Sequence, residues 1–320
     1  MSRFAKVKIQ GMYGLPKAHT AVTEALLDSV ELFFRRHKGR VLGITGAGVS
    51  VASGIPDYRG PNGTYRVYGG YTPILHHELV LQHSSRQRYW ARSFFGIRPA
   101  FLAKPNKIHF AMAGLEQKGY LGGLITQNVD SLHAQAGSKN VLELHGTLKN
   151  VKCIDCGHTE PRAEFQKRLE ELNPQWVEFY QHMANYGEEP ARRPDGDVEL
   201  PPGLRYDAFE YPKCKSCKAG HYMPTVIFFG GNVPDDVRIR SFEMVDQAEA
   251  LFVCGTSLAT FSAYRLVKHA HDMGREIFVA NLGETRGDKD ATVKLDASAE
   301  EVVPPLAARL GIKVTDPIDP

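Results

Sequence analysis

Residues 41–50, which read VLGITGAGVS, decide the fold. The short apolar run at 41–45 predicts a buried strand, and the glycines after it predict a tight turn. Similar runs recur at 123–126, 225–229, 250–254, 276–280 and 291–295, and helical patterns such as 263–273 lie between several of them. Continuous apolar strands that alternate with helices are typical of a parallel sheet. We therefore predict an α/β fold, with a Rossmann-like parallel sheet covered by helices on both faces.

The glycine-rich turn Gly46-Ala47-Gly48 indicates a phosphate-binding loop. Ligands of open parallel sheets bind at the carboxyl ends of the strands, and small residues there let backbone N–H groups approach phosphate oxygens. A P-loop needs a lysine where Val49 stands, and the usual dinucleotide fingerprint needs a glycine where Val51 stands. The turn therefore indicates nucleotide binding without the details of either motif. A plain tight turn is the alternative.

Polar residues follow three of the predicted strand ends. They are Asp57, Arg59, Gln127, Asn128, Asp130 and His145. Because such ends meet at one rim of a parallel sheet, we expect these side chains to gather there. Amide side chains can orient a ribose or a water molecule, and a histidine is a natural general base for a hydroxyl. A purely structural role is the alternative for a lone histidine.

Four of the five cysteines form two C-x-x-C pairs, which predict a structural zinc site. The pairs are Cys153 with Cys156 and Cys214 with Cys217. Four thiolates can surround zinc tetrahedrally and leave no open position for chemistry. The gap between the pairs is longer than in most zinc ribbons, so two unrelated pairs are the alternative. Cys254 lies in an apolar run and is expected to be buried.

The composition excludes several classes of protein. The 320 residues are 42% hydrophobic and 23% charged, which is typical of a globular chain of about two domains. No apolar run approaches the ~20 residues of a membrane span. The net charge of +3 is too small for a nucleic-acid footprint. We expect neither a membrane nor a nucleic acid among the partners.

Two segments interrupt the strand–helix alternation and predict a smaller, discontinuous domain. Residues 61–110 are aromatic and basic, and 151–222 contain both cysteine pairs. We expect this helical and zinc-ribbon domain to be inserted into a Rossmann-like domain made of 41–60, 111–150 and 223–312. Residues 1–40 would add a segment and a helix at 21–36, and 313–320 would form a C-terminal tail. The stretch 188–202 is predicted to be a surface loop.

In chain order, these motifs resemble those of the sirtuins, the NAD-dependent protein deacylases. The strings are GAGVS at 46–50, SGIPDYR at 53–59, TQNVDSLH at 126–133, LHG at 144–146, both cysteine pairs, VIFFG at 226–230, GTS at 255–257 and NLG at 281–283. RQRYWAR at 86–92, LNPQW at 172–176, PDGDV at 194–198 and Tyr58 resemble the class II branch, and within it the mitochondrial lipoamidase sirtuins.

The resemblance implies that NAD binds across the rim as a co-substrate, while zinc stays structural. The residues implied for NAD are Gly46, Ala47, Gly48, Ile55, Pro56, Asp57, Tyr58, Arg59, Tyr65, Gln127, Asn128, Val129, Asp130, Gly255, Thr256, Ser257, Asn281, Leu282, Gly283 and Ala299. The two glycine-containing loops would hold the phosphates. The segment 281–283 and Ala299 would meet the adenosine half.

The resemblance also implies the reaction. The carbonyl oxygen of an acyl-lysine attacks the ribose carbon as nicotinamide leaves, and His145 then acts as general base on a ribose hydroxyl. Hydrolysis of the O-alkyl-imidate gives free lysine and O-acyl-ADP-ribose. Gln127, Asn128 and Asp130 complete the implied catalytic set. The expected partners are acyl-lysine protein substrates, and the expected state is a monomer.

The acyl group is read from Tyr89 and Arg92, which are three residues apart and share one face of a predicted helix. The spacing resembles that of the class II sirtuin that removes succinyl and glutaryl groups, and arginine pairs well with a carboxylate. This favours succinyl, glutaryl or methylglutaryl groups, whereas the lipoamidase resemblance favours lipoyl or biotinyl groups. An exposed amphipathic helix is the alternative. Ile227, Phe229 and Gly230 complete the implied substrate set.

Two other functions remain open. A protein ADP-ribosyltransferase would use the same pocket, and a silent NAD-binding scaffold would lack a motif residue, although His145, Asn128, Asp130 and Arg59 are all present. Residues 1–23 contain no acidic residue and fit either a mitochondrial presequence or a plain tail. The resemblance favours the mitochondrial matrix, with the cytoplasm as the alternative.

Overall fold

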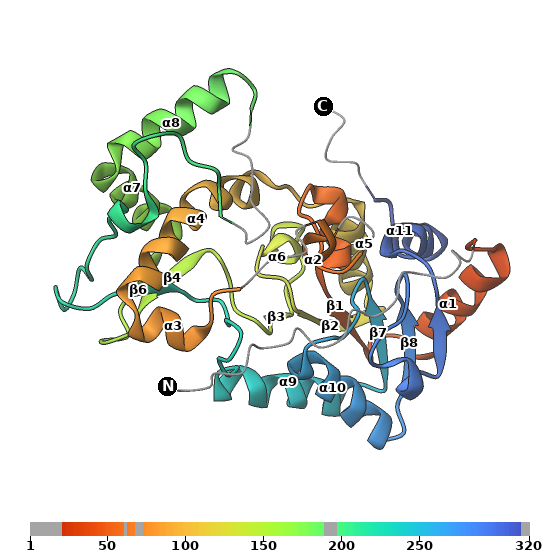
Figure 1. Cartoon of the computed structure of the whole chain (residues 1–320). Coiled ribbons are helices and arrows are strands. Elements are labelled where there is room, and N and C mark those ends of the chain that lie inside the picture. Colours follow the sequence, from red (N-terminus) through yellow and green to blue (C-terminus); the bar gives the residue numbers. More distant parts are fainter. Residues whose placement is uncertain (1–20, 61–62, 68–72, 189–196, 315–320) are drawn as a thin grey trace.

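The computed structural model describes residues 21–60, 63–67, 73–188 and 197–314, which form two lobes (Figure 1). The large lobe surrounds a six-stranded sheet and the small lobe a three-stranded sheet. Most of the predicted presequence or tail at 1–23 lies outside the described residues. No helix within these ranges is long and apolar enough to cross a membrane.

The sheet of the large lobe is parallel, in the order β3-β2-β1-β7-β8-β9. Its strands are β1 Val41–Thr45, β2 Leu121–Thr126, β3 Val141–Glu143, β7 Ala250–Cys254, β8 Glu276–Ala280 and β9 Val293–Leu295. Every residue of the central strands β1 and β7 is buried, as expected for strands covered on both faces. The predicted α/β fold is confirmed.

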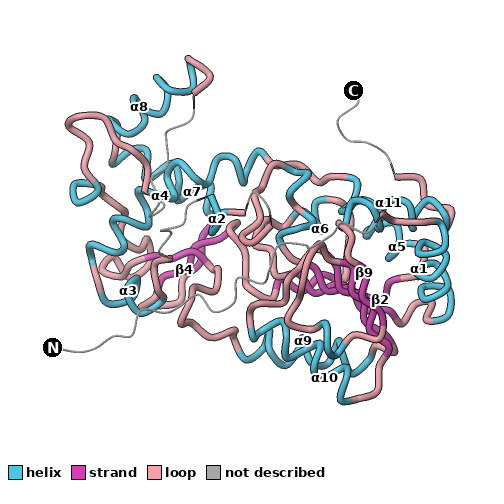
Figure 2. Tube along the Cα trace, turned by 45° about the vertical axis from the view of Figure 1, so that its right-hand side comes forward, coloured by secondary structure: helices cyan, strands magenta, loops and turns pink. Residues whose placement is uncertain are grey.

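Helices cover both faces of this sheet (Figures 1 and 2). On one face lie α1 Glu24–Arg36, α5 Lys107–Gln117 and α11 Ala299–Arg309, and on the other α9 Asp235–Gln247 and α10 Phe261–Asp272. The side chains of β7 alternate between the two cores, so that Phe252 and Cys254 face the first and Leu251 and Val253 the second. Cys254 is therefore buried, as predicted.

The small lobe has an antiparallel sheet in the order β5-β4-β6. Its elements are β4 Asn150–Cys153, β5 Thr159–Pro161, β6 Tyr222–Pro224, α3 His76–Leu81, α4 His83–Leu102, α7 Arg162–Leu172 and α8 Pro174–Asn185. Its core is aromatic: Trp90, Phe165, Trp176 and Phe209 are all buried there, and the rings of Trp90 and Phe165 are 4.5 Å apart. Segments from both sides of β2 and β3 in the sequence thus share one core.

Short segments complete the described chain. They are α2 Thr64–Val67, α6 Leu132–Gln135 and the 3₁₀ turns Ala47–Val49, Val51–Ser53, Tyr206–Ala208 and Asp288–Asp290.

The predicted strand at 225–229 is wrong. The run is apolar, but β6 ends at Pro224, and the chain then crosses from the small lobe to the large one. Its backbone bonds go to loops instead of a sheet: the Thr225 N–H donates to the Asn150 carbonyl oxygen at 3.1 Å, and the Ile227 N–H donates to the His145 carbonyl oxygen at 2.8 Å. The apolar residues therefore mark a seam between the lobes.

The predicted surface loop at 188–202 is wrong at two described positions. Asp197 and Val198 are each only 4% exposed. The Val198 N–H donates to the hydroxyl of Tyr206 at 2.6 Å, and that hydroxyl donates to the Val198 carbonyl oxygen at 3.1 Å. Residues 189–196 of the predicted loop lie outside the described ranges. The backbone of Val198 is bonded to the side chain of Tyr206, and the polar composition of the stretch does not predict this contact.

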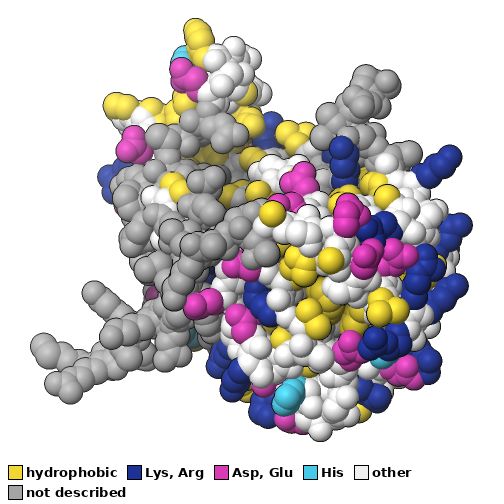
Figure 3. All heavy atoms as spheres, turned by 90° about the vertical axis from the view of Figure 1, so that its right-hand side faces the viewer, with side chains coloured by type: hydrophobic (Ala, Val, Ile, Leu, Met, Phe, Trp, Pro, Cys, Tyr) yellow, Lys and Arg dark blue, Asp and Glu magenta, His cyan; other side chains and the backbone are white. Residues whose placement is uncertain are grey.

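On the side of the large lobe drawn in Figure 3, basic and acidic side chains are mixed around a group of hydrophobic ones. In the same lobe, Arg309 of α11 is paired with Asp28 at 2.5 Å and with Glu31 at 3.3 Å, both on α1.

Candidate functional site

Two glycine-containing loops meet at the carboxyl ends of β1 and β7. The Gly48 N–H donates to the Gly255 carbonyl oxygen at 2.9 Å. A Cβ atom on Gly48 would lie 2.8 Å from that oxygen, and one on Gly46 would lie 2.7 Å from the Cβ of Thr256. Gly255 itself has φ 60°, a left-handed conformation that favours glycine. Only residues without side chains allow this approach, which leaves a backbone-lined surface suited to phosphate.

A buried polar network holds the residues that follow β2. The side-chain amide of Asn128 donates to the Gly46 carbonyl oxygen at 3.1 Å and to the Ser50 hydroxyl at 2.9 Å. Ser50 in turn donates to Asp130 at 2.7 Å. Asn128 and Asp130 are thus tied to the glycine-rich turn, as their expected gathering requires. Ser50 belongs to the GAGVS string but was not among the predicted site residues.

Gln127 links three elements of the large lobe. Its side-chain amide donates to the Thr45 carbonyl oxygen at 3.2 Å and to the Thr256 hydroxyl at 2.8 Å. Its side-chain oxygen accepts from the hydroxyl of Thr260, the N-cap residue of α10, at 3.1 Å. The ends of β1 and β7 and the start of α10 are therefore fixed relative to one another.

His145 follows β3 and lies directly beside Gln127. Its Nδ1 is 3.1 Å from the Gln127 carbonyl oxygen, which can only accept, so Nδ1 carries a proton. Its Nε2 is 2.7 Å from the hydroxyl oxygen of Ser262, near the start of α10. Burial lowers the pKa of His145 to about 4, and the bond to Gln127 opposes this shift. The imidazole is neutral near pH 7, with its lone pair on Nε2.

Two further histidines lie close to the rim and were not among the predicted site residues, although one of them ends the TQNVDSLH string at 126–133. His109 and His133 are 0% and 1% exposed, and their ring centroids are 4.7 Å apart. His133 Nε2 is 3.0 Å from the Thr45 hydroxyl, and His109 Nδ1 accepts from the Asn106 N–H at 3.3 Å. Burial lowers the pKa of His109 to about 4, against the opposing charge of Asp130, and lowers that of His133 well below its usual value.

The segment after the glycine-rich turn folds back on itself. Asp57 accepts from the Gly60 N–H at 3.0 Å, and the Arg59 guanidinium lies 5.3 Å from the centre of the Tyr65 ring. That ring is also 5.5 Å from the ring of Tyr58. The Ile55 N–H, next to Pro56, donates to the Ser50 carbonyl oxygen at 3.3 Å. The expected NAD residues 58 and 59 therefore lie against Tyr65, which belongs to α2.

The predicted adenosine segment follows β8, beside the end of β7. Asn281 donates through its side chain to the carbonyl oxygens of Leu282 and Gly283 at 3.0 and 3.2 Å. The Gly255 N–H donates to the Ala280 carbonyl oxygen at 3.1 Å, which joins this segment to the second glycine-containing loop. Two more contacts extend the rim: the Ser257 carbonyl accepts from Arg286, and the Val129 carbonyl accepts from Leu148. Ala299 is buried at the first position of α11.

The predicted acyl residues lie in the small lobe. The ring of Tyr89 packs edge-on against Trp90 at 5.0 Å and against Phe228 at 5.3 Å. Arg92 is paired with the buried carboxylate of Asp197. Asp197 belongs to the PDGDV string, but it was not predicted to pair with Arg92, which lies 105 residues away in the chain.

Arg88 shares the same carboxylate. Its Nε lies 2.8 Å from Oδ1 and 3.0 Å from Oδ2 of Asp197. Two guanidinium groups on one face of α4 therefore meet a single carboxylate.

The other predicted substrate residues lie in the crossing segment. The Ile227 N–H bonds to His145, as described above, and the Phe229 carbonyl oxygen accepts from the His76 N–H at 2.9 Å. Phe229 is 39% exposed, and Gly230 has φ 78°. This segment therefore runs from the histidine to α3, along the seam between the lobes.

The four paired cysteines come together in the small lobe. Their sulfur atoms all lie within 4.8 Å of one another, with Cys153 and Cys217 at 3.9 Å and Cys156 and Cys214 at 3.7 Å. A tetrahedron with Zn–S bonds of about 2.3 Å has edges of roughly 3.8 Å. The Ser216 N–H donates to Cys214 at 3.4 Å, which suits a thiolate ligand. The donor set and its spacing fit a closed zinc site.

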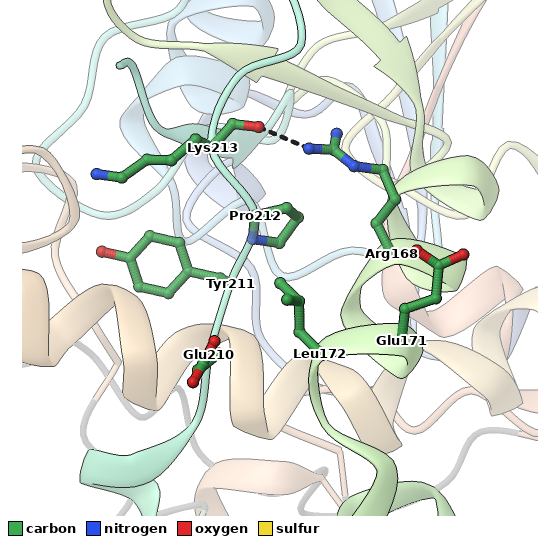
Figure 4. Close-up of a pocket in the computed structure, with 7 residues that line it drawn as sticks. All are labelled: Arg168, Glu171, Leu172, Glu210, Tyr211, Pro212 and Lys213. Atoms are coloured by element: carbon green, nitrogen blue, oxygen red, sulfur yellow. Dashed lines mark hydrogen bonds between the residues drawn. The ribbon is translucent and has the colours of Figure 1, made fainter. Parts of the chain in front are cut away.

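A separate hollow of the small lobe contains none of the predicted site residues (Figure 4). It is lined by Arg168, Glu171, Leu172, Glu210, Tyr211, Pro212 and Lys213. The guanidinium group of Arg168 donates to the Lys213 carbonyl oxygen at 2.6 Å, so it bonds to another residue that lines the hollow. A smaller hollow is bordered by Val129 and Asp130 and lies next to the rim.

Comparison with known proteins gives consistent matches. The profile of the Sir2 family matches residues 46–262. The NAD-dependent protein deacylase SIR4 of Batrachochytrium dendrobatidis is 43% identical over 301 residues, which cover 91% of this chain and 98% of the relative. The NAD-dependent protein deacylase Sirt4 of Drosophila melanogaster is 38% identical over 289 residues, covering 90% and 88%.

Solved structures match over similar lengths. A Sir2 complex with a p53 peptide and NAD+ has a TM-score of 0.66 and 28% identity, covering 88% of this chain and 98% of that one. A Sir2 variant with a deacetylated p53 peptide and 3′-O-acetyl ADP-ribose has a TM-score of 0.68 and 28% identity, covering 90% and 99%.

Proposed function

The chain belongs to the Sir2 family and is an NAD-dependent protein deacylase, and we propose that its rim removes acidic or long acyl groups from protein lysines. NAD is the co-substrate, and the four-cysteine cluster fits a structural zinc site. The proposed products are nicotinamide, O-acyl-ADP-ribose and free lysine. The observation that carries the proposal is a neutral imidazole, His145, at the end of a rim with two adjoining glycine loops.

The residues of the rim have separate proposed roles. The two glycine-containing loops hold the phosphates through backbone N–H groups other than those of Gly48 and Gly255, which donate to carbonyl oxygens within the fold. The segment 281–283 and Ala299 hold the adenosine half. Asn128 and Asp130, fixed by Ser50, line the nicotinamide and ribose pocket. When bound, NAD supplies the ribose carbon that accepts the acyl oxygen as nicotinamide leaves.

His145 starts the second stage of the proposed reaction. Its Nδ1–H bond to the Gln127 carbonyl oxygen keeps the basic lone pair on Nε2. That nitrogen takes a proton from a ribose hydroxyl, which prepares the hydroxyl to attack the acyl carbon. Its low pKa keeps it unprotonated at physiological pH, so the base needs no prior loss of a proton.

The acyl class is proposed from the arginines of α4. Arg88 and Arg92 place two positive charges against one buried carboxylate, that of Asp197. An acyl group with a terminal carboxylate can join this cluster as a second negative charge, and charge-assisted bonds to guanidinium are strong. We therefore favour glutaryl, methylglutaryl and succinyl groups, with lipoyl as the neutral alternative. Tyr89 and Phe228 would form the apolar wall.

A mass-spectrometric screen tests this proposal. One lysine peptide carries acetyl, succinyl, glutaryl, methylglutaryl, biotinyl or lipoyl groups, each with and without NAD. We expect NAD-dependent loss of an acidic acyl group with the matching acyl-ADP-ribose. Loss of lipoyl alone would contradict the carboxylate assignment. Transfer of labelled ADP-ribose to protein, without free lysine, would replace deacylation by ADP-ribosyl transfer.

The proposed site of action is the mitochondrial matrix, on acyl-lysine proteins. It rests on the class II strings, such as RQRYWAR at 86–92. Fractionation of cells that express the full chain tests it: recovery in the cytosol, with none in the matrix, would overturn the assignment.

A further inference from the structure

Ser262 contacts the histidine that the proposed function makes the general base. Its hydroxyl oxygen lies 2.7 Å from His145 Nε2, the nitrogen that must accept the ribose proton. On the other side of the ring, Nδ1 bonds to the Gln127 carbonyl oxygen. The imidazole of His145 thus lies between the Ser262 hydroxyl and the Gln127 carbonyl oxygen. The carbonyl oxygen of Gln127 orients the ring in this arrangement.

The start of α10 contacts both His145 and Gln127, the residue that orients the His145 ring. Thr260, its N-cap, donates to the side-chain oxygen of Gln127 at 3.1 Å, while Ser262 lies two positions later in the same turn. Ser262 is 117 residues from His145 in the sequence. The positive end of the helix also disfavours an imidazolium nearby. One turn of helix therefore fixes the position and the neutral form of the ring.

A serine hydroxyl suits both protonation states of the ring. While the ring is neutral, Nε2 has a lone pair and accepts a hydrogen bond from the Ser262 hydroxyl. After Nε2 has gained a proton, it becomes a donor, and the same hydroxyl can rotate and accept, because its oxygen has two lone pairs. Alanine can do neither, and threonine can do both.

We infer that Ser262 is a positioning residue for His145: it holds the imidazole with its lone pair on Nε2, yields that nitrogen to the ribose hydroxyl, and then stabilises the protonated ring. The inference rests on the proposed function of His145. In this step one proton moves from the ribose oxygen to Nε2, and the hydroxyl of Ser262 rotates without losing its own proton. Nicotinamide release precedes this step and does not use the base.

The kinetic test separates the two stages. Exchange of labelled nicotinamide into NAD, with acyl peptide present, reports the first stage, and free lysine reports both. For Ser262→Ala we expect exchange within about twofold of the parent and deacylation kcat reduced about tenfold, the loss of one hydrogen bond to a reacting group. Ser262→Thr should recover most of the rate. Ser241→Ala removes a buried serine hydroxyl from α9, away from the rim, and serves as the matched control.

Three kinetic outcomes overturn the inference. One is equal loss of exchange and deacylation in Ser262→Ala, which would make the residue structural. Another is an unchanged deacylation rate in that variant. The third is a rate for Ser262→Thr as low as that of Ser262→Ala. If the unaltered chain releases no free lysine from any acyl peptide, the proposed function fails first, and the next measurement decides about Ser262.

Nitrogen-15 NMR of the imidazole tests the positioning without turnover. The His145 signals are assigned by their loss in His145→Gln. The full chain should show one tautomer, with the proton on Nδ1, and Ser262→Ala should shift the Nε2 signal. An identical Nε2 signal in both proteins would refute the contact, whatever the enzyme's activity.

Discussion

The two lobes are stabilised in different ways. The large lobe buries both faces of a parallel sheet, and its rim is tied together by bonds between neighbouring strand ends, such as Gly48 to Gly255. The small lobe has a three-stranded sheet, an aromatic core and a four-cysteine cluster. Chemistry and stability are thus assigned to different lobes: the proposed reacting groups belong to the large lobe, while the four cysteines that fit a structural zinc site lie in the small one.

The chain offers a direct way to follow the lobes separately. Both of its tryptophans, Trp90 and Trp176, lie in the aromatic core of the small lobe. Tryptophan fluorescence therefore reports on that lobe, whereas far-ultraviolet circular dichroism reports on the helices of both.

Breaking the zinc site should give the largest effect. Cys153→Ser removes one of four thiolates, and structural zinc contributes folding energy outright. We expect zinc content to fall from one per chain to near zero, with a red-shifted tryptophan emission and most helical signal retained. Metal analysis and fluorescence measure both. Cys254→Ala, at a cysteine buried in the other lobe, should keep its zinc; equal zinc loss in the two variants would remove the contrast.

Replacing the base should destroy activity without unfolding either lobe. For His145→Gln we expect deacylation to fall about 10³-fold, because general bases contribute typically that much. Zinc content and tryptophan emission should stay unchanged. A turnover assay and a thermal melt test this. Normal turnover would sink the general-base role, and loss of the melting transition would mean that the residue is structural.

Acid should weaken the large lobe through its buried histidines. The pKa of His109 is lowered to about 4 in the fold, so between about pH 6.5 and pH 4 the unfolded chain binds the extra proton. Stability is therefore full above pH 6.5 and falls as the pH drops, by up to about 3 kcal/mol for this histidine. Denaturant unfolding of the full chain and of His109→Gln at several pH values measures it. Parallel curves would show that His109 does not titrate this way.

The smallest effect is expected at the pairing of Arg92 with Asp197 in the small lobe. Arg92→Met leaves Arg88 on the carboxylate of Asp197 and removes one of two guanidinium groups. We expect kcat/KM for glutaryl peptide to fall about tenfold and that for acetyl peptide to change less than threefold, as for one lost charged bond. Asp197→Asn, which removes the competing carboxylate, should raise the preference for glutaryl. An equal loss on both peptides would make Arg92 structural.

The large lobe was readable from sequence because its information is local. Each central strand is a continuous apolar run, and the glycine turn and Asn128 follow directly from strand ends. The run at 225–229 broke the rule, since an apolar seam between lobes has the same composition as a buried strand. The zinc ligands were also readable, because each C-x-x-C pair carries its own spacing.

Other contacts were unreadable because they join distant segments. Ser262 meets His145 across 117 residues, and Asp197 meets Arg92 across 105. Asp197 lies in the PDGDV string, but that string does not indicate its partner, and a single serine or aspartate carries no periodicity. His109 and His133 likewise meet only when α5 packs beside α6. These pairs can be identified only once the fold is known.

The bond between Thr225 and Asn150 brings together the points where the chain enters and leaves the zinc-bearing segment. A side chain at Gly146 would collide with the Thr225 carbonyl oxygen, so the two crossings are in close contact. The segment between them is thus a cassette with adjoining ends. Its loops can change in length without moving the backbone of the large lobe, whereas its core must keep matching α4, where Trp90 packs on Phe165.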